Sequence, residues 1–226
     1  MRTFFAIIIL WFCTVHDVHA QGHKGVYLST YSMYGPQVGF GLSSGNRADF
    51  KQNMFRRGPG ASSLFGMSYY KFVTERQNVG ISLNFMQQRW NFSEQENPVA
   101  LAPDARYSIS EISIQTPLEF NHYFSPRSQK WFMGFSFDPG IIIQKNLERK
   151  RNNNVDSTLA YEYSERADFA KMNIGGCIKI GSDFDMRSDN TLRFYFMINA
   201  RTFLRNESKK SNTYGAFAVA QYFWSQ

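Results

Sequence analysis

The chain has 226 residues, a formal net charge of +7 and a mean hydropathy of −0.40, which hydropathy alone would attribute to a soluble protein. With only two cysteines, Cys13 and Cys177, it cannot be a small domain held together by several disulfides. The basic balance points to anionic partners, either nucleic acid or phosphorylated surfaces.

The N-terminal residues 1–20 predict a signal peptide. Arg2 supplies the positive start, residues 4–12 form a short apolar run, and Ala20 ends a small-residue cleavage site. The run is too short for a bilayer, which takes about 20 residues. Cleavage would leave residues 21–226 as the mature chain. An exported protein rarely meets nucleic acid, so we expect no nucleic acid partner and take membrane lipid and lipopolysaccharide as the anionic counterparts.

Eight strand-like segments follow in the mature chain. Apolar and polar residues alternate in them with a period of two, as in 191–204, where Phe196 and Arg193 fall on opposite faces. Most segments reach the 9–11 residues of a tilted membrane strand, whereas soluble strands usually have about 5–6. The segments are 25–42, 62–74, 78–92, 106–124, 130–144, 168–181, 191–204 and 213–224.

The connections between these segments alternate in length. Polar stretches 43–60, 93–105 and 145–167 are long, whereas 75–77 and 125–129 are short. Long outer loops and short periplasmic turns are typical of transmembrane barrels. The pattern therefore predicts a periplasmic N-terminus and a first long loop outside the cell.

The alternation changes phase in two segments. Residues 79–85 place apolar side chains at odd positions, but Trp90 and Phe92 are even, and the fourth segment slips similarly between Ile109 and Ile112. A β-bulge or emergence of the strand from the membrane would explain the change. Strands one, two and eight do not reveal which face is apolar.

A basic, asparagine-rich run, ERKRNNN, occupies residues 148–154. We assign it to the third long loop. A solvated loop is one interpretation, and an anion-binding patch on the outer surface is the other.

Polar residues opposite the apolar face are candidates for the barrel interior. An eight-stranded barrel is just wide enough for side chains to fill it, so charges of both signs should pair as a plug. A narrow conduction path is the alternative. The expected plug residues are Glu119, Asp138, Lys171, Lys179, Arg193 and Arg201. Aromatic residues near strand ends predict the two membrane interfaces. They are Trp90, Tyr107, Tyr123, Trp131 and Trp224.

No catalytic or metal site is expected. His122 has Ser125 and Glu119 close by in sequence, but the predicted topology places it at the periplasmic turn, the wrong rim for outer-leaflet chemistry. One cysteine and two distant histidines lack the spacing of metal ligands. We therefore predict no catalysis and no cofactor.

The hairpin 106–143 resembles the outer-membrane β-barrel domain family of small eight-stranded barrels. Its members carry a strand of the form E-I-P-L-x-x-x-Y-x-F, a turn, and then an aromatic strand that leads into a long loop. The resemblance implies a Gram-negative outer-membrane barrel, and members of the PorT type assist a protein-secretion system. The C-terminus is also similar to a barrel-assembly signal. The matching residues are Glu111-Ile112, Pro117-Leu118-Glu119-Phe120, Tyr123-Phe124, Trp131-Phe132-Met133-Gly134 and Pro139-Gly140, with Gly215, Tyr222 and Trp224 at the C-terminus.

The sequence thus predicts an all-β fold, an eight-stranded antiparallel up-and-down transmembrane β-barrel over residues 21–226. We expect it in the cell outer membrane after signal-peptide cleavage, with a structural role or an adhesive one through its loops, which are candidate contacts for a protein partner. Two alternatives stay open. One is a PorT-like accessory barrel of a secretion system, and the other is a secreted, soluble, lipocalin-like barrel that binds an apolar ligand with its apolar face inward.

Overall fold

The computed structural model describes residues 32–46, 55–74, 76–94, 105–124, 130–151, 154–155, 172–186, 190–204 and 212–225. These residues form ten strands in one antiparallel sheet. The predicted signal peptide and Lys171 lie outside them. No helix in this part of the chain is long and apolar enough to cross a membrane. The strands are β1 (Ser32–Asn46), β2 (Phe55–Thr74), β3 (Gln77–Glu94), β4 (Ala105–Gln115), β5 (Leu118–Tyr123), β6 (Trp131–Arg151), β7 (Asn154–Val155), β8 (Met172–Asp185), β9 (Thr191–Leu204) and β10 (Asn212–Ser225).

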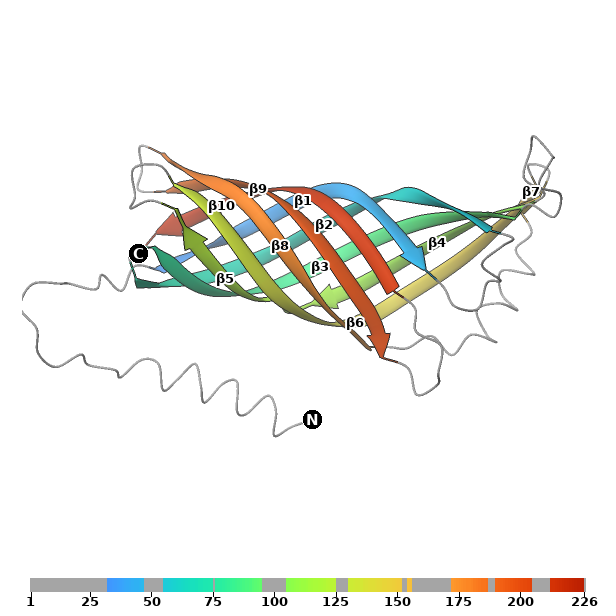
Figure 1. Cartoon of the computed structure of the whole chain (residues 1–226), viewed down its shortest axis with the longest axis horizontal. Coiled ribbons are helices and arrows are strands. Elements are labelled where there is room, and N and C mark those ends of the chain that lie inside the picture. The colour runs from blue at the N-terminus through green and yellow to red at the C-terminus, as the bar shows by residue number, and fades with distance from the viewer. Residues whose placement is uncertain are drawn as a thin grey trace, which may run out of the picture.

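The sheet closes on itself because β1 pairs with both β2 and β10 (Figure 1). Two of the ten strands are not separate members of the barrel. β5 continues β4 after a break at Thr116 and Pro117, and both pair with β3 and β6, while β7 only extends the end of β6. Eight strands therefore surround the axis, which confirms the predicted fold.

Proline at position 117 explains the break between β4 and β5, since it has no N–H to donate to the ladder. Hydrogen bonds on both sides nevertheless continue the sheet. The Ser82 amide donates to the Pro117 carbonyl at 3.0 Å, and the Thr116 amide donates to the Pro139 carbonyl at 2.9 Å. The inward and outward faces consequently keep their order through the break.

The two ends of the barrel differ. One end of the barrel is here called the turn end (Figure 1). At this end β2 leads into β3 through Glu75 and Arg76, β8 leads into β9, and β10 ends. The opposite end, called the loop end, receives the connections from β1 to β2, from β3 to β4 and from β9 to β10. This arrangement matches the predicted alternation of short and long connections.

The outward face carries a continuous apolar band. Side chains such as Phe40, Phe196 and Ile198 are 68%, 69% and 70% exposed. Along β9 the band runs from Leu192 to Ala200, which at about 3.3 Å per residue and a tilt of about 40° covers roughly 20 Å along the axis. Buried polar and charged side chains face the interior. A soluble lipocalin-like barrel would have the opposite arrangement, so the structure overturns that alternative.

One half of the barrel is taller than the other. β2, β3 and β6 have 20, 18 and 21 residues, and β4 with β5 extends from Ala105 to Tyr123, whereas β1, β8, β9 and β10 have 15, 14, 14 and 14. The longer strands project beyond the others at the loop end (Figure 1). We call this projecting sheet the wall. It consists of 55–60 of β2, 88–94 of β3, 105–111 of β4 and 144–151 of β6.

The wall corrects three predicted loop boundaries. Residues 55–60, 93–94 and 145–151 were expected in long loops, but they extend strands β2, β3 and β6. The basic run at 148–151 is therefore part of β6 rather than of a loop. Residues 152–153 lie outside the described residues. The polar composition misled the prediction because a strand that stands in water needs no apolar outward face.

Candidate functional site: a filled interior and a raised wall

The interior near the turn end is occupied by Arg193 and its partners. Asp183 and Arg193 face each other across the β8–β9 ladder. Arg193 donates from Nε to Asp183 Oδ1 at 2.6 Å and from Nη2 to Oδ2 at 2.9 Å, and Nη2 also donates to the Tyr123 hydroxyl at 2.5 Å. This fork-to-fork geometry is the strongest form of a charge-assisted pair.

Aromatic rings enclose the Arg193 guanidinium. Its central carbon lies 4.6 Å from the Phe132 ring centre, 4.8 Å from that of Tyr70 and 4.9 Å from that of Phe223. Desolvated cation–π contacts of this kind contribute about 2 kcal/mol or more. Arg193 and its three rings thus fill this section of the barrel.

A second ion pair lies further along the axis. Lys179 on β8 is bonded to Glu119 on β5, and Glu119 also accepts hydrogen bonds from Tyr70 and, at 2.9 Å, from Ser82. The Lys179 ammonium lies 5.2 Å from the Tyr195 ring centre. Each charge is therefore both paired and hydrogen-bonded, as burial away from water requires.

Glycines on the inward face make room for these large side chains. Gly80 stands opposite Tyr70 on the neighbouring strand, and a Cβ at Gly80 would collide with the tyrosine ring. Gly175 stands opposite Arg201 in the same way. Alternation of small and large inward residues is what fills a narrow barrel.

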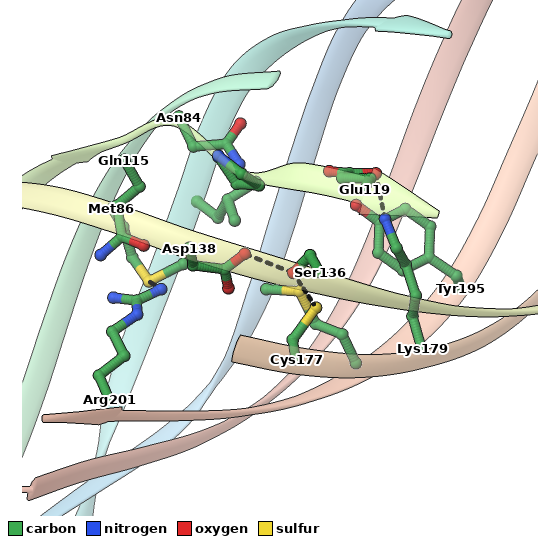
Figure 2. A pocket seen from close by; sticks show the side chains of 13 residues that line it. Asn84, Met86, Gln115, Glu119, Ser136, Asp138, Cys177, Lys179, Tyr195 and Arg201 are labelled. Atoms are coloured by element: carbon green, nitrogen blue, oxygen red, sulfur yellow. Dashed lines mark hydrogen bonds and ion pairs between the residues drawn. The ribbon is translucent and has the colours of Figure 1, made fainter. Parts of the chain in front are cut away.

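The third layer surrounds Arg201 and is less tightly paired (Figure 2). Arg201 donates to Gln88 Oε1 at 3.0 Å and contacts the Met86 sulfur at 2.9 Å. Asp138 accepts a hydrogen bond from Ser136. Of the ion pairs seen among the described residues, none joins Asp138 to Arg201. Both side chains line a void of about 10 Å³, the space of about one water molecule.

The predicted plug residues thus divide among three layers. Glu119 and Lys179 form one pair, while Arg193 pairs with Asp183, which was missed because the sixth segment was expected to end at residue 181. Its position on the same face as Lys179, four residues earlier, was the available signal. Asp138 and Arg201 line the void without pairing to each other, and the predicted member Lys171 lies outside the described residues.

Two of the five aromatic residues expected at the membrane interfaces lie on the outward face, and the other three point inward. Trp131 and Trp224 are 56% and 39% exposed on the outward face near the turn end. Trp90, Tyr107 and Tyr123 point inward and are 3%, 6% and 5% exposed, so they cannot contact lipid headgroups. Position near a strand end does not decide orientation, because side chains alternate between two faces there as elsewhere.

The wall has an apolar inner face. Trp90 and Phe92 of β3 form a buried cluster with Tyr107 and Ile109 of β4. A Cβ at Gly45 would lie only 2.7 Å from the Trp90 indole nitrogen, so β1 packs closely against this ring. This cluster continues the inward faces of β3 and β4 beyond the polar interior.

A charged pair marks the base of the inner face. Lys145 lies 3.4 Å from Glu111 and 5.7 Å from the centre of the Trp90 ring. Glu111 is 1% exposed, so the pair belongs to the interior rather than to the surface. Glu111 stands directly opposite Gln88, so the pair lies level with the polar layer that Gln88 shares with Arg201.

The outer face of the wall is polar. Arg89 and Asn91 of β3, Arg106 of β4 and Asn146 and Glu148 of β6 are all exposed. The faces are thus reversed relative to the membrane band. The alternation of buried and exposed residues in β3 is unbroken from Asn78 to Phe92, so emergence from the membrane explains the phase change and a bulge in β3 does not. The irregularities lie in the pairing of β2 and of β6 with their neighbours.

One solved structure supports this architecture. The chain is similar to the outer membrane protein OprG from Pseudomonas aeruginosa, with a TM-score of 0.51 and 8% identity over 91% of this chain and 98% of that one. The chain has the fold of a small outer-membrane β-barrel. Neisserial surface protein A matches with a TM-score of 0.39 and 8% identity over 85% and 96%, and Ail of Yersinia pestis with 0.37 and 10% over 85% and 99%. No family model matches the sequence. No curated protein matches it either.

Proposed function

We propose that this protein is an outer-membrane barrel without catalytic activity, whose interior is closed and whose working surface is the wall. The observation that carries the proposal is the projection of β2, β3, β4 and β6 beyond the other strands of the barrel at the loop end. With the loop end outside the cell, the wall rises above the lipid on one side only. Such a surface suits the binding of another molecule, in adhesion or in contact with lipopolysaccharide.

The filled interior supports a binding role over solute transport. The layers of Arg193, Lys179 and Arg201 span the barrel, and the described void among them holds about one water molecule. Ions would have to cross two buried, hydrogen-bonded ion pairs. We therefore regard the charged interior as a structural plug.

The proposal is tested on whole cells and in lipid bilayers. A short epitope inserted in the connection between β3 and β4 should be accessible on intact cells. The purified protein should show no unitary conductance in a planar lipid bilayer bathed in potassium chloride solution. The same epitope placed between β2 and β3 at the turn end serves as the matched control and should become accessible only after lysis. Accessibility of the turn-end epitope on intact cells, or reproducible conductance, would contradict the proposal.

A second role follows from the resemblance to PorT-type barrels, that of an accessory to a protein-secretion system. The filled interior is compatible with this role, since an accessory barrel need not conduct the secreted chain. A strain that lacks the gene distinguishes the two roles. Unchanged secretion of signal-bearing cargo would remove the accessory role and leave the binding role.

A further inference from the structure

The outward face of the wall carries two exposed arginines on neighbouring strands, and the register places further cationic residues at nearby ladder positions. Arg106 of β4 is exposed and stands directly opposite Lys150 of β6. On its other side Arg106 faces Ser93 of β3, which in turn faces Arg56 of β2. Arg89, also exposed, lies on the same face of β3, closer to the membrane band. Residues distant in the sequence therefore form one basic surface.

The charges of this surface are poorly balanced. Its described cations are Arg89 and Arg106, and both are exposed. Among the outward positions of the described wall, Glu148 is the one acidic residue, and it stands opposite Ser108 rather than a cation. A bound anion would balance the charge of the two arginines.

The height of the basic residues above the apolar band selects the kind of anion. Phe85 is the last outward apolar residue of β3, and Arg89 follows four residues later, which is about 10 Å along the axis. Arg106 of β4 lies six residues beyond Ile112, which places it about 15 Å further along the axis than Ile112. Headgroup regions add only about 5–8 Å on each side of a typical bilayer core. A phospholipid headgroup would therefore reach at most Arg89, whereas a larger phosphorylated sugar headgroup would reach both arginines.

The opposite half of the barrel provides an internal comparison. At the loop end its outward positions are Ser44 of β1, Thr202 of β9 and Tyr214 of β10, and no charged residue occupies an outward position there among the described residues. The two halves meet the same lipid along the apolar band. A general attraction of the protein to headgroups does not explain why cations occur on one side only.

We propose that the outward face of the wall, centred on Arg89 and Arg106, binds the phosphorylated sugar headgroup of an outer-leaflet glycolipid. Guanidinium groups suit this ligand because they donate two parallel hydrogen bonds to a phosphate. The inference rests on the proposed function in one respect, since the glycolipid is available only if the wall stands outside the cell. It adds to that function a ligand class and the residues that contact it.

The experiment measures glycolipid binding by the full-length mature protein in detergent micelles. The probe is purified lipopolysaccharide with its lipid A and core phosphates, compared with the same material after enzymatic dephosphorylation. We expect the Arg89→Gln/Arg106→Gln variant to bind the phosphorylated probe about tenfold more weakly or worse, since hydrogen bonds to charged groups are the stronger ones. Arg89→Lys/Arg106→Lys keeps the charge and should lose less.

The matched control is Lys71→Gln/Arg76→Gln, which removes the same charge at the turn end and should bind as the unmodified protein does. Heat-modifiable migration on a gel verifies that each variant is folded. Equal affinity of Arg89→Gln/Arg106→Gln and the unmodified protein, or equal binding of the dephosphorylated probe, would overturn the inference.

Failure of the inference is distinguishable from failure of the proposed function. An epitope in the connection between β3 and β4 that is hidden on intact cells refutes the external orientation, whatever the lipid titration shows. An accessible epitope together with unchanged lipid binding in Arg89→Gln/Arg106→Gln refutes only the glycolipid site.

Discussion

The lower and upper parts of β3 have the same pleat but opposite distributions of polarity. Between Val79 and Phe85 the outward side chains are apolar and the inward ones are polar, including Ser82 and Asn84. Above them the outward residue is Arg89 and the inward ones are Trp90 and Phe92. The geometry of the strand does not change at this boundary. The surroundings change from lipid to water.

This contrast shows how one strand serves two solvents. In the membrane band the barrel needs an apolar exterior, and its narrow interior accepts paired charges. In the wall the sheet has one face toward water, so its hydrophobic residues gather on the inner face as in a soluble antiparallel sheet. The proposed function follows the same division, with the band anchoring the protein and the wall binding another molecule.

The largest expected effect concerns the interior of the band. Arg193→Ala leaves the Asp183 carboxylate buried and unpaired, and removing one partner of a buried pair typically costs about 3–5 kcal/mol. Urea titration of the protein in lipid vesicles measures this loss. The double variant Asp183→Leu/Arg193→Met should recover most of the stability, because paired hydrophobic replacements are often neutral. A double variant as unstable as Arg193→Ala would contradict the assignment of a simple structural pair.

The second prediction compares outward positions of the band and of the wall. Phe196→Arg places a charge at the middle of the apolar band and should lower the free energy of unfolding by about 2–4 kcal/mol. Asn91→Arg makes the same kind of change on the outward face of the wall and should stay within about 0.5 kcal/mol, as exposed substitutions usually do. The same titration measures both variants. Equal losses would mean that the wall is also immersed in lipid.

The smallest effect tests the change of face within β4. Ile109 is 1% exposed and points inward, so Ile109→Val should cost about 0.5–1.5 kcal/mol through loss of packing. Ile112 lies on the outward face, where Ile112→Val leaves no cavity and should cost less. A larger loss of stability from Ile112→Val than from Ile109→Val would show that the boundary between the wall and the band is assigned incorrectly.

Sequence reasoning recovered the barrel and much of its interior for a physical reason. Alternation with a period of two fixes which residues share a face, so Glu119, Lys179, Arg193 and Arg201 could be assigned to one interior from the neighbours they alternate with. It could not assign partners. Asp183 joined Arg193 through the register of the β8–β9 hairpin, and register depends on the whole sheet.

The wall was the part that sequence reasoning did not find. Its residues are polar on one face and irregular in phase, so residues 145–151 were assigned to a loop and Trp90 and Tyr107 to a lipid interface. The phase change at Trp90 was visible, but a bulge and emergence from the membrane predict the same pattern. Only the unbroken ladder between β3 and β4 separates the two explanations.

By itself the sequence determined the strands, the alternation of their faces and the asymmetry of their connections, because these depend on residues close together in the chain. The tertiary structure decided which charges meet in the interior, how far each strand continues beyond the lipid, and that Arg106 stands opposite Lys150. These features depend on the closure of the sheet and on the register between strands. No local pattern specifies where residues separated by long connections will meet.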